Sequence, residues 1–327
     1  MKAIRYHAYG PPEVLRLQEV DPPAVGDDEV LIRVRAASVN PLDWHFMRGA
    51  PYLARLAWGL TRPRGTSLGA DLAGHVEAVG RDVTEFKRGD EVFGSRGLST
   101  AERAAAFAEY ATLPASGALL KKPANLTFEQ AAAVPVAALT ALQALRGRVR
   151  PGQKVLVNGA AGGTGTFTVQ LAKTMGAEVT GVCSTPNVGL VLSIGADHVV
   201  DYTKEDFTHS GKRYDLLVDL VGNRRPGECR RVLAPRGVLV GAAPSKGQWI
   251  GPVIGMLRVI LLSRMVSQTM LTFLAQISKD DLTELRELLE AGKITPIIDR
   301  TYPLTELPEA VAYLETGRAR GKVVITM

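Results

Sequence analysis

The stretch N-G-A-A-G-G-T-G at residues 158–165 decides how the rest of the chain is interpreted. It follows an apolar run, K-V-L-V-N at residues 154–158, and precedes a segment of helical character at residues 167–175. A glycine-rich turn between a strand and a helix binds a nucleotide pyrophosphate, because glycines allow close backbone approach and the first N–H groups of the helix face the anion. The turn alone is weak support, so the flanking sequence has to carry the assignment.

Composition and charge describe an ordinary globular protein of one large or two smaller domains. The chain has 327 residues, of which 46% are hydrophobic and 22% charged, and its formal net charge is +6. This length allows a sizeable core. Lysines and arginines are scattered and no basic stripe with interleaved aromatic residues occurs, which argues against a nucleic-acid partner. At most, the excess charge suits a phosphorylated small molecule.

Cysteine usage points to a reducing compartment. Cys183 and Cys229 are the two cysteines, they form no C-x-x-C pair, and residues 1–6 (M-K-A-I-R-Y) do not resemble the start of a signal peptide. We therefore expect no disulfide framework, no cysteine-rich zinc lobe, and a cytoplasmic location. The apolar stretch at residues 250–266 contains two arginines and is too short for a transmembrane helix.

The pattern of predicted secondary structure changes at residue 123. Residues 1–122 read as short alternating strands broken by Pro-Pro and Gly-Asp pairs, which predicts a mostly β domain. Beyond it, strands alternate with helices, which predicts βαβ units and a doubly wound parallel sheet with the glycine-rich turn as its first strand-to-helix loop. The expected strands are 154–158, 178–182, 198–200, 215–219 and 237–241, and the expected helices are 126–145 with a break at Pro135, 163–175, 187–194 and 226–233.

The last 50 residues resemble the first domain more than the middle of the chain. Ser278 can cap a helix that ends near Gly292, and a helix at 308–316 and a strand at 322–326 follow. We predict a catalytic domain at 1–122, a nucleotide-binding domain at 123–277 and a return to the catalytic domain at 278–327. Residues 246–278 are apolar without a clear period, which leaves open a cover over the active site, a subunit interface, or membrane contact; the interrupting arginines disfavour the last.

The second expected strand bears on the choice of cofactor. In the usual dinucleotide-binding fingerprint an acidic residue about 20 positions beyond the glycines binds the ribose 2′-hydroxyl of NAD. Here the strand at 178–182 is followed by Cys183, Ser184 and Thr185, with no carboxylate. Hydroxyls can donate to a 2′-phosphate that a carboxylate would repel, so this pattern favours NADPH over NADH. The two hydroxyl residues would equally serve as caps of the next helix, and no second nucleotide motif supports a flavin.

Six motifs, in order along the chain, resemble one known family. They lie at residues 40–43 (N-P-L-D), 69–74 (G-A-D-L-A-G), 134–141 (V-P-V-A-A-L-T-A), 158–165, 195–202 (G-A-D-H-V-V-D-Y) and 320–325 (R-G-K-V-V-I). With these motifs the chain resembles, over nearly its whole length, the quinone oxidoreductase (ζ-crystallin-like) branch of the medium-chain dehydrogenase/reductase superfamily. The resemblance implies a GroES-like catalytic domain split around a Rossmann domain, commonly as a homodimer, with NADPH in the cleft between the domains.

The resemblance also implies which residues hold the cofactor. Ala160, Gly162 and Gly165 would occupy the three fingerprint positions, with alanine in the first. Many relatives carry Lys or Arg just after the Ser-Thr pair, where this chain has Pro186, so Lys204 is an alternative source of positive charge. The implied contacts run from the nicotinamide (Thr140) to the 2′-phosphate (Ser184) and the adenosine (Tyr202). The full set is Asn40, Thr140, Ala161, Gly162, Gly163, Thr164, Gly165, Ser184, Tyr202, Asn223, Ala242, Ala243, Ser245 and Lys322.

The same comparison of motifs predicts that no zinc binds. Zinc-dependent relatives need a Cys near the first motif and a His-Glu pair in the second, because zinc takes thiolate and imidazole ligands. Asp43 stands roughly at the Cys position, Ala70 and Asp71 replace the pair, and His75 falls in the following strand as a structural residue. Without a Lewis acid, the substrate that accepts the hydride must already be electrophilic, such as a quinone or an alkene conjugated to a carbonyl. The enzyme then mainly positions it and donates hydrogen bonds to its oxygen.

Three residues are candidates for contacts with that acceptor. Asn40 can bind the nicotinamide ribose or the substrate, or it can be a turn residue before Pro41. His45 can donate to the substrate oxygen, or it can be a half-exposed residue without function. Tyr52 is the third candidate. The sequence thus predicts an NADPH-dependent, zinc-independent reductase of small quinones or α,β-unsaturated carbonyls. The alternatives are an enoyl or 2-alkenal reductase for substrates of another size, and an NADPH-binding sensor or structural partner with vestigial activity.

Overall fold

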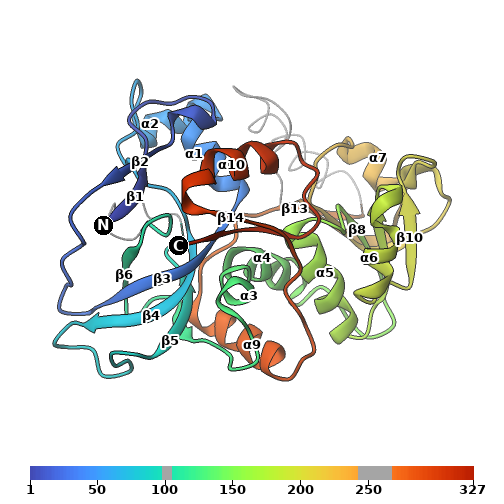
Figure 1. The fold of residues 1–327 in the computed structure, drawn as a ribbon. Helices are drawn as coiled ribbons and strands as arrows, with labels where there is room; N and C mark the ends of the chain where they lie inside the picture. Colours follow the sequence, from blue (N-terminus) through green and yellow to red (C-terminus); the bar gives the residue numbers. More distant parts are fainter. Residues whose placement is uncertain (98–104, 242–266) are drawn as a thin grey trace. The chain divides into compact units, whose positions relative to one another are not determined.

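The structure, a computed structural model, describes residues 1–97, 105–241 and 267–327 (Figure 1). These residues form two compact units, one of Met1–Leu139 with Gln276–Met327 and one of Thr140–Ala275. The expected cofactor contacts Ala242, Ala243 and Ser245 lie outside the described residues, as does most of the apolar segment that starts at residue 246. No helix in the described part of the chain is both long and apolar enough to cross a bilayer.

The first unit is built on a seven-stranded, mostly antiparallel sheet. Its strand order is β14-β15-β3-β4-β5-β7, with β6 paired to β3 off this path, and β1 and β2 form a separate pair. The strands are β1 (Lys2–Arg5), β2 (Arg16–Glu19), β3 (Glu29–Val39), β4 (Asp71–Val79), β5 (Glu91–Ser95), β6 (Tyr110–Pro114), β7 (Leu119–Lys121), β14 (Ile298–Pro303) and β15 (Lys322–Thr326). The helices are α1 (Pro41–Arg48), α2 (Arg55–Trp58), α3 (Phe128–Ala132), α9 (Lys279–Glu290) and α10 (Leu307–Glu315), with short 3₁₀ turns η1 (Pro12–Val14), η2 (Tyr52–Ala54) and η6 (Leu304–Glu306).

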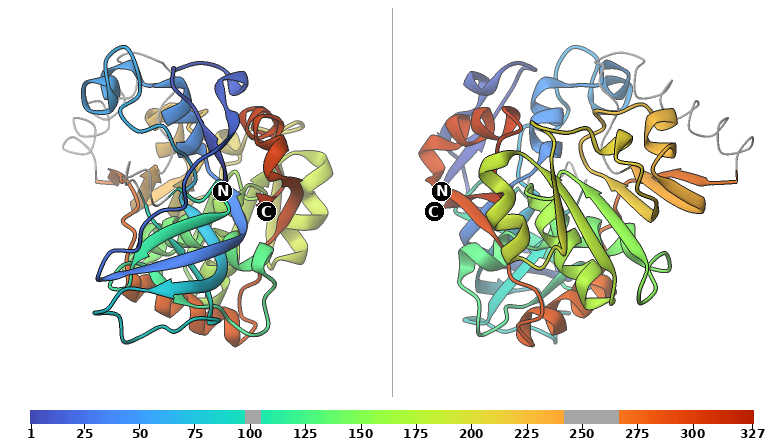
Figure 2. Two further views of the ribbon diagram at one scale, coloured as in Figure 1. Left: turned by 60° about the vertical axis from the view of Figure 1, so that its left-hand side comes forward. Right: turned by 90° about the vertical axis from the view of Figure 1, so that its right-hand side faces the viewer.

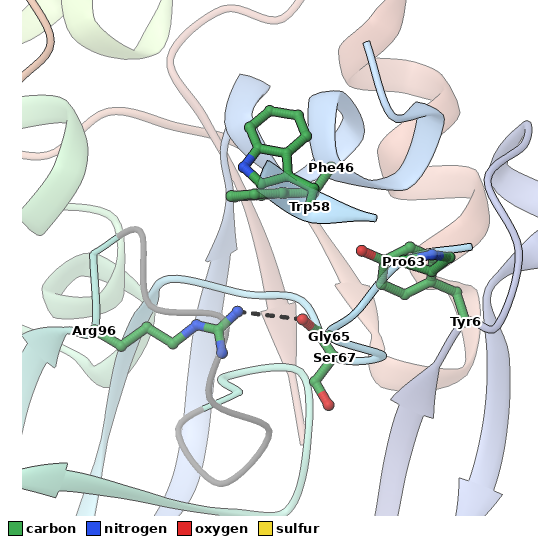
Figure 3. Close-up of a pocket in the computed structure, with 7 residues that line it drawn as sticks. All are labelled: Tyr6, Phe46, Trp58, Pro63, Gly65, Ser67 and Arg96. Atoms are coloured by element: carbon green, nitrogen blue, oxygen red, sulfur yellow. Dashed lines mark hydrogen bonds between the residues drawn. The ribbon is translucent and has the colours of Figure 1, made fainter. Parts of the chain in front are cut away.

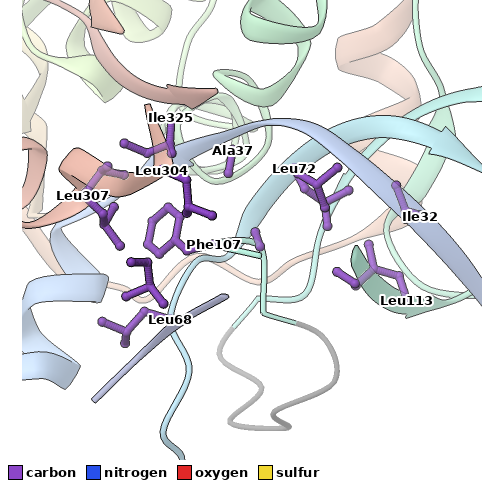
Figure 4. Close-up of a cluster of buried hydrophobic side chains, with 14 of the residues drawn as sticks. Ile32, Ala37, Leu68, Leu72, Phe107, Leu113, Leu304, Leu307 and Ile325 are labelled. Carbon is purple, nitrogen blue, oxygen red and sulfur yellow. The ribbon is translucent and has the colours of Figure 1, made fainter. Parts of the chain in front are cut away.

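Alternation along β3 explains why this strand is central. Val30, Ile32 and Val34 are buried while Arg33 and Arg35 are exposed, because successive side chains of a strand point to opposite faces. The core under the sheet joins parts of the chain that are distant in sequence, as Figure 4 shows. Labelled members include Ile32, Leu72, Phe107, Leu307 and Ile325. The C-terminal elements α10 and β15 therefore complete the core that the N-terminal strands begin.

The second unit contains a six-stranded sheet in which all pairs are parallel, with order β10-β9-β8-β11-β12-β13. Its strands are β8 (Lys154–Asn158), β9 (Glu178–Cys183), β10 (His198–Asp201), β11 (Tyr214–Asp219), β12 (Leu233–Gly241) and β13 (Thr269–Thr272). Its helices are α5 (Gly163–Thr174), α6 (Val188–Ser193) and α7 (Pro226–Arg230), with 3₁₀ turns η4 (Thr185–Asn187) and η5 (Phe207–His209). Figure 2 (right) shows the twist of this sheet. The strand order reverses between β8 and β11, so the turn after β8 lies at a topological switch point, where doubly wound sheets bind ligands.

The predicted fold class, a GroES-like β domain split around a Rossmann domain, is confirmed. The compact units, however, divide at residues 139/140 and 275/276, whereas the sequence placed the domain bounds at 122/123 and 277/278. Helix α3 explains the first difference, because it packs against β3 and β4 of the first unit. Helix α4 (Pro135–Leu145) runs across the division, and the expected break at Pro135 falls between α3 and α4. Helix α1 was not expected, because Asn40-Pro41 reads as a turn in the sequence.

Candidate functional site

Gly162 and Gly165, two of the four glycines in the turn, differ in their surroundings. A Cβ added at Gly165 would lie 2.0 Å from the Gly159 carbonyl oxygen, so the packing of the turn itself requires glycine there. A Cβ at Gly162 would meet only that same oxygen, at 3.5 Å, an ordinary contact. Gly162 has φ −80° and ψ 173° and stands as the N-cap of α5. The fold therefore does not require glycine at position 162, whereas a ligand close to the backbone would.

The start of α5 offers hydrogen-bond donors to such a ligand. The backbone N–H groups of Gly163, Thr164 and Gly165 belong to the first turn, where an α-helix supplies no acceptor. The helix is 12 residues long and adds the positive end of its dipole. An open position at Gly162 next to unpaired N–H groups fits a pyrophosphate. The structure thus brings the predicted residues from Ala161 to Gly165 into one turn at the start of α5.

A carboxylate from the neighbouring strand lies beside the end of β9, and the sequence did not reveal it. Asp201 ends the neighbouring strand β10 and pairs in register with Cys183, so it lies next to Ser184 and Thr185. Thr185 Oγ1 donates to Asp201 Oδ2 at 2.5 Å, and Lys204 Nζ lies 3.5 Å from the same oxygen. The hydrogen bond from Thr185 is the largest of the effects that lower the pKa of Asp201 to about 2. Asp201 is therefore an anion whose charge Lys204 offsets, and the sequence missed it because it stands 16 positions beyond Thr185.

Three other predicted contacts in the second unit are partly or largely exposed, and two of them follow the ends of β9 and β10. Ser184 Oγ accepts a hydrogen bond from Asn187 Nδ2 at 3.2 Å and stays partly exposed. Tyr202 follows Asp201 and is 53% exposed, so it is not a core aromatic residue. Thr140 begins this unit within α4 and is also partly exposed. These three side chains remain accessible to a nucleotide.

Asn223 belongs to a polar cluster at the carboxyl ends of β8 and β11. Its Oδ1 accepts from Asn158 Nδ2 at 3.0 Å, and the same nitrogen donates to Asp219 Oδ1 at 2.8 Å. That Asp219 oxygen also accepts from the backbone N–H groups of Val221 and Gly222. The loop after β11 is thereby fixed to the first residue of the glycine-rich turn, a link that only the strand order reveals.

Asn40 stands at the centre of a buried polar network in the first unit. Its Nδ2 donates to Asp71 Oδ2 at 2.9 Å and to the Ser38 carbonyl oxygen at 3.4 Å, while its Oδ1 accepts from Lys322 Nζ at 2.6 Å. Lys322 Nζ also donates to the Val39 carbonyl oxygen at 3.2 Å and lies 3.9 Å from Asp71 Oδ2. The exposed fractions of Asn40 and Lys322 are 2% and 4%. Both hydrogen-bonding ends of the Asn40 amide are therefore engaged inside the protein.

Burial governs the electrostatics of this network. The pKa of Asp71 is raised, chiefly because its carboxyl group is removed from water, and the neighbouring Lys322 opposes that change. The pKa of Lys322 is lowered, chiefly by its own burial, against the attraction of Asp71. Ser38 Oγ, the backbone N–H of Val136 and the Ser95 hydroxyl also donate to Asp71. A buried carboxylate with these donors and a cation beside it is a satisfied structural group.

The positions that the sequence compared with zinc ligands carry the carboxylates of Asp43 and Asp71, and both have partners inside the protein. Asp43 Oδ2 accepts from the Asn40 N–H at 2.8 Å and its Oδ1 from the Gly69 N–H at 3.0 Å, so both oxygens face backbone donors. Burial raises the pKa of Asp43 to about 6. Next to Asp71 the positive charge is supplied by Lys322. His75 lies on β4 with Nε2 3.8 Å from Glu91 Oε1. Among the described residues, no group of three or more His, Cys, Asp and Glu side chains is arranged to hold a metal ion.

His45 and Tyr52 lie outside this network. His45 Nδ1 is 2.9 Å from the Ala50 carbonyl oxygen, an atom that can only accept, so Nδ1 carries the proton. Its ring stacks on Trp44 at 3.7 Å between centroids, and burial lowers its pKa. Neutral His45 therefore presents Nε2 as an acceptor. Tyr52 is partly buried, with the Arg55 guanidinium 4.6 Å from its ring centroid.

A small cavity lies beside α1 in the first unit (Figure 3). Its volume is about 10 Å³, room for about one water molecule and far below the roughly 300 Å³ of small ligand pockets. The Arg96 guanidinium donates to the Ser67 carbonyl oxygen at 3.2 Å across it. The lining residues are Tyr6, Phe46, Trp58, Pro63, Gly65, Ser67 and Arg96. This cavity is too small for a quinone ring.

A glycine-rich turn at the switch point of a parallel sheet, joined in one chain to a split β unit of the GroES type, defines a two-domain nicotinamide-dependent dehydrogenase or reductase. Family models agree with both parts. The model of the alcohol dehydrogenase GroES-like domain matches residues 26–124, and the model described as zinc-binding dehydrogenase matches residues 194–325.

Similar proteins narrow the class. The tomato (Solanum lycopersicum) 2-methylene-furan-3-one reductase is 35% identical over 99% of this chain and 79% of its own length. The Arabidopsis thaliana chloroplastic NADPH-dependent alkenal/one oxidoreductase is 33% identical over the same shares. The solved quinone oxidoreductase of Coxiella burnetii superimposes with a TM-score of 0.88 at 32% identity, covering 100% of this chain and 99% of that one. The chain belongs to the quinone oxidoreductase branch of the medium-chain dehydrogenase/reductase superfamily, as its motifs predicted.

Proposed function

We propose that this protein is an NADPH-dependent reductase that transfers a hydride to quinones or to α,β-unsaturated carbonyl compounds without a metal ion. The observation that carries the proposal is the pair Gly162 and Gly165. The fold requires glycine at 165 but leaves position 162 open beside the free N–H groups of α5. A nucleotide pyrophosphate is the group that such a position suits. The names of the relatives, which include NADPH-dependent reduction of alkenals and ketones and reduction of quinones, support the same activity.

The second nucleotide feature is the pocket for the 2′-phosphate. Ser184 supplies a hydroxyl there, and Lys204 is the candidate base in place of the one that Pro186 lacks, with part of its charge offset by Asp201. Asp201 would repel a second anion, but it is held by Thr185 and paired with Lys204. The pocket therefore prefers NADPH over NADH by a margin that depends on Lys204. The exposed ring of Tyr202 packs on the adenosine.

When bound, NADPH supplies a hydride from C4 of its nicotinamide. This hydride would reduce an enone at its β-carbon, or a quinone, and with one proton from solvent the substrate would gain two electrons and two hydrogens. Because the Asn40 amide is buried and already bonded to Asp71 and Lys322, Asn40 would fix the start of α1 rather than bind the nicotinamide half of the cofactor. Neutral His45 would accept a hydrogen bond at Nε2. Tyr52 is the candidate hydrogen-bond donor to the carbonyl oxygen of the substrate.

The donors around Asp43 and Asp71 support zinc independence. A divalent ion at Asp71 would have to displace the Lys322 ammonium, and one at Asp43 would have to break two backbone hydrogen bonds. Neither place supplies thiolate or imidazole ligands, which zinc prefers. The reaction then relies on acceptors that are electrophilic by themselves.

Two finer proposals concern assembly and location. Among the described strands of the second unit β13 is the edge strand, and Leu271 and Leu274 are 36% and 69% exposed, which suits strand pairing with a second copy in a homodimer. Light scattering after size exclusion tests the dimer. Cys183 and Cys229 are buried free thiols, in keeping with a reducing cytoplasm.

The direct experiment is NADPH oxidation by a panel of 1,4-quinones and enones after exhaustive chelation of metals. We expect turnover with both classes and no stimulation by added zinc. Activity that depended on zinc would refute metal independence. Tight NADPH binding without turnover of any acceptor would refute the reductase and favour a sensor or structural role. Turnover confined to long-chain enoyl substrates would instead favour an enoyl reductase.

A further inference from the structure

One segment of the first unit has a composition that its position in the fold does not explain. Residues 51–64 form the 3₁₀ turn η2 and the short helix α2, followed by a stretch of bends, and they are called the leucine-arginine segment below. The segment contains Leu53, Leu56 and Leu60, three arginines, one Tyr and one Trp, and no Asp or Glu. It is therefore both apolar and positively charged.

The inward face of the segment is fixed to α1. Arg55 Nε donates to the Gly49 carbonyl oxygen at 2.9 Å and its Nη2 to the Arg48 carbonyl oxygen at 3.0 Å. Its guanidinium lies 4.4 Å from the ring centroid of Tyr9. The Trp58 ring packs on Phe46 with centroids 4.3 Å apart. These contacts give the segment one defined orientation, so what it exposes is a fixed surface.

Three leucines of the segment are exposed to solvent. Leu53, Leu56 and Leu60 are 54%, 64% and 66% exposed. Leu53 and Leu56 are three positions apart in the helical turns, which places them on one face. Exposed arginines follow at 62 and 64. Leucines of this exposure on a rigid segment mark a contact surface, because soluble proteins otherwise keep such side chains apart.

We propose that the leucine-arginine segment docks on the surface of an anionic lipid bilayer. The leucines enter the boundary between headgroups and acyl chains, and Arg62 and Arg64 bind the lipid phosphates. The net charge of +6 and the absence of acidic residues in the segment complement an anionic surface. A second copy of this chain is the less suitable occupant, because a symmetric contact would bring the arginines of both copies together.

Vesicle binding of the full chain tests this proposal without any use of activity, so its outcome is independent of the proposed reductase function. The probes are vesicles of phosphatidylcholine alone and of phosphatidylcholine mixed with phosphatidylglycerol. We expect sedimentation with the mixed vesicles, weaker binding to the neutral ones, and loss of the difference at high salt. Absence of binding to the mixed vesicles would overturn the proposal.

Variants locate the contact. Leu56→Gln/Leu60→Gln should lower the partition coefficient by at least about tenfold, and Arg62→Gln/Arg64→Gln should abolish the preference for anionic lipid. Leu192→Gln, which alters a leucine 46% exposed on α6, is the matched control and should bind as the wild type does. Unchanged melting temperatures establish that the variants fold. Equal loss in the Leu192 control, or wild-type binding by the leucine pair, would refute the assignment. A change from dimer to monomer without an effect on vesicles would assign the leucines to a second copy instead.

Discussion

Replacing Gly162 and Gly165 by alanine, one at a time, separates the effect of the turn on folding stability from its effect on cofactor binding. At Gly165 the new Cβ would lie 2.0 Å from the Gly159 carbonyl oxygen, a backbone atom that cannot move away cheaply. At Gly162 the nearest atom is 3.5 Å away, and the backbone angles there suit any residue. The two substitutions are chemically identical and only three positions apart, so each is the control of the other.

The expected magnitudes follow from these distances. Overpacking against backbone costs about 1–3 kcal/mol or more, so Gly165→Ala should destabilise the second unit by about 3 kcal/mol. At about 2–4 °C per kcal/mol, its melting temperature should fall by roughly 6–12 °C. Gly162→Ala changes only the N-cap and should cost less than about 1 kcal/mol. In the complex, however, its methyl group would occupy the space of the pyrophosphate, so NADPH should bind at least about tenfold more weakly, or about 1.4 kcal/mol.

Thermal melts of the cofactor-free variants and calorimetric titration with NADPH measure both effects. Hydrogen exchange localises the loss of stability to the sheet of the second unit. We expect Gly162→Ala to be stable but weak in binding, and Gly165→Ala to be unstable before any cofactor is added. Wild-type affinity in Gly162→Ala would show that no phosphate approaches that backbone, and an unchanged melting temperature in Gly165→Ala would show that the turn does not need glycine for packing.

Three further predictions concern charges. Lys322→Met should lower the free energy of unfolding by about 3–5 kcal/mol in chemical denaturation, because it leaves Asp71 buried without a cation. The double variant Asp71→Asn/Lys322→Met should recover part of that loss. Strictly additive changes in unfolding free energy for the two substitutions would contradict the pairing. Ser184→Asp should weaken the binding of NADPH at least about tenfold more than the binding of NADH. Lys204→Gln should weaken NADPH binding relative to NADH binding by only a few-fold, about 0.5–1 kcal/mol, because this lysine is exposed. Equal losses of affinity for the two cofactors would contradict the assignment of the 2′-phosphate site. Asp43 has a pKa of about 6 in the folded chain against 3.8 ordinarily, so the folded state binds more protons between these values, and its contribution should make unfolding easier by up to about 3 kcal/mol as the pH rises from 4 to 6. Asp43→Asn should flatten this slope in melts across that range, and an unchanged slope would show that another group causes it.

The parts of the fold that follow local patterns were predictable. The second unit combines apolar strands with helices at regular intervals, and β8 has the expected bounds, 154–158. Helix α9 begins after Ser278, whose side chain accepts from the Asp281 N–H as a cap should. The sequence did not reveal α1, because Asn40 and Pro41 suit a turn as well as a helix start. Asn40 and Asp43 in fact form a capping box there, which needs the Asp43 side chain to fold back on the Asn40 N–H.

The parts of the site that depend on strand order were not predictable. Asp201 comes beside Thr185 only because β10 pairs with β9 in one register, and no local signal reports that pairing. Likewise Lys322 reaches Asn40 across 282 positions because β15 pairs with β3. From the sequence, Asn40 and Lys322 were predicted as separate contacts of the cofactor. The structure joins them to each other, with Asp71 as the third member that the motif comparison considered only as a zinc position.

The measurement that tests the central claim most directly is the fate of the transferred hydrogen. NADPH carrying deuterium at C4 is incubated with an enone and the metal-stripped protein, and the product is analysed by mass spectrometry and NMR. The account predicts one deuterium at the former β-carbon of the saturated ketone, at the same rate with and without a chelator. Product without deuterium at that carbon, or deuterium transfer only after zinc is added, would contradict it.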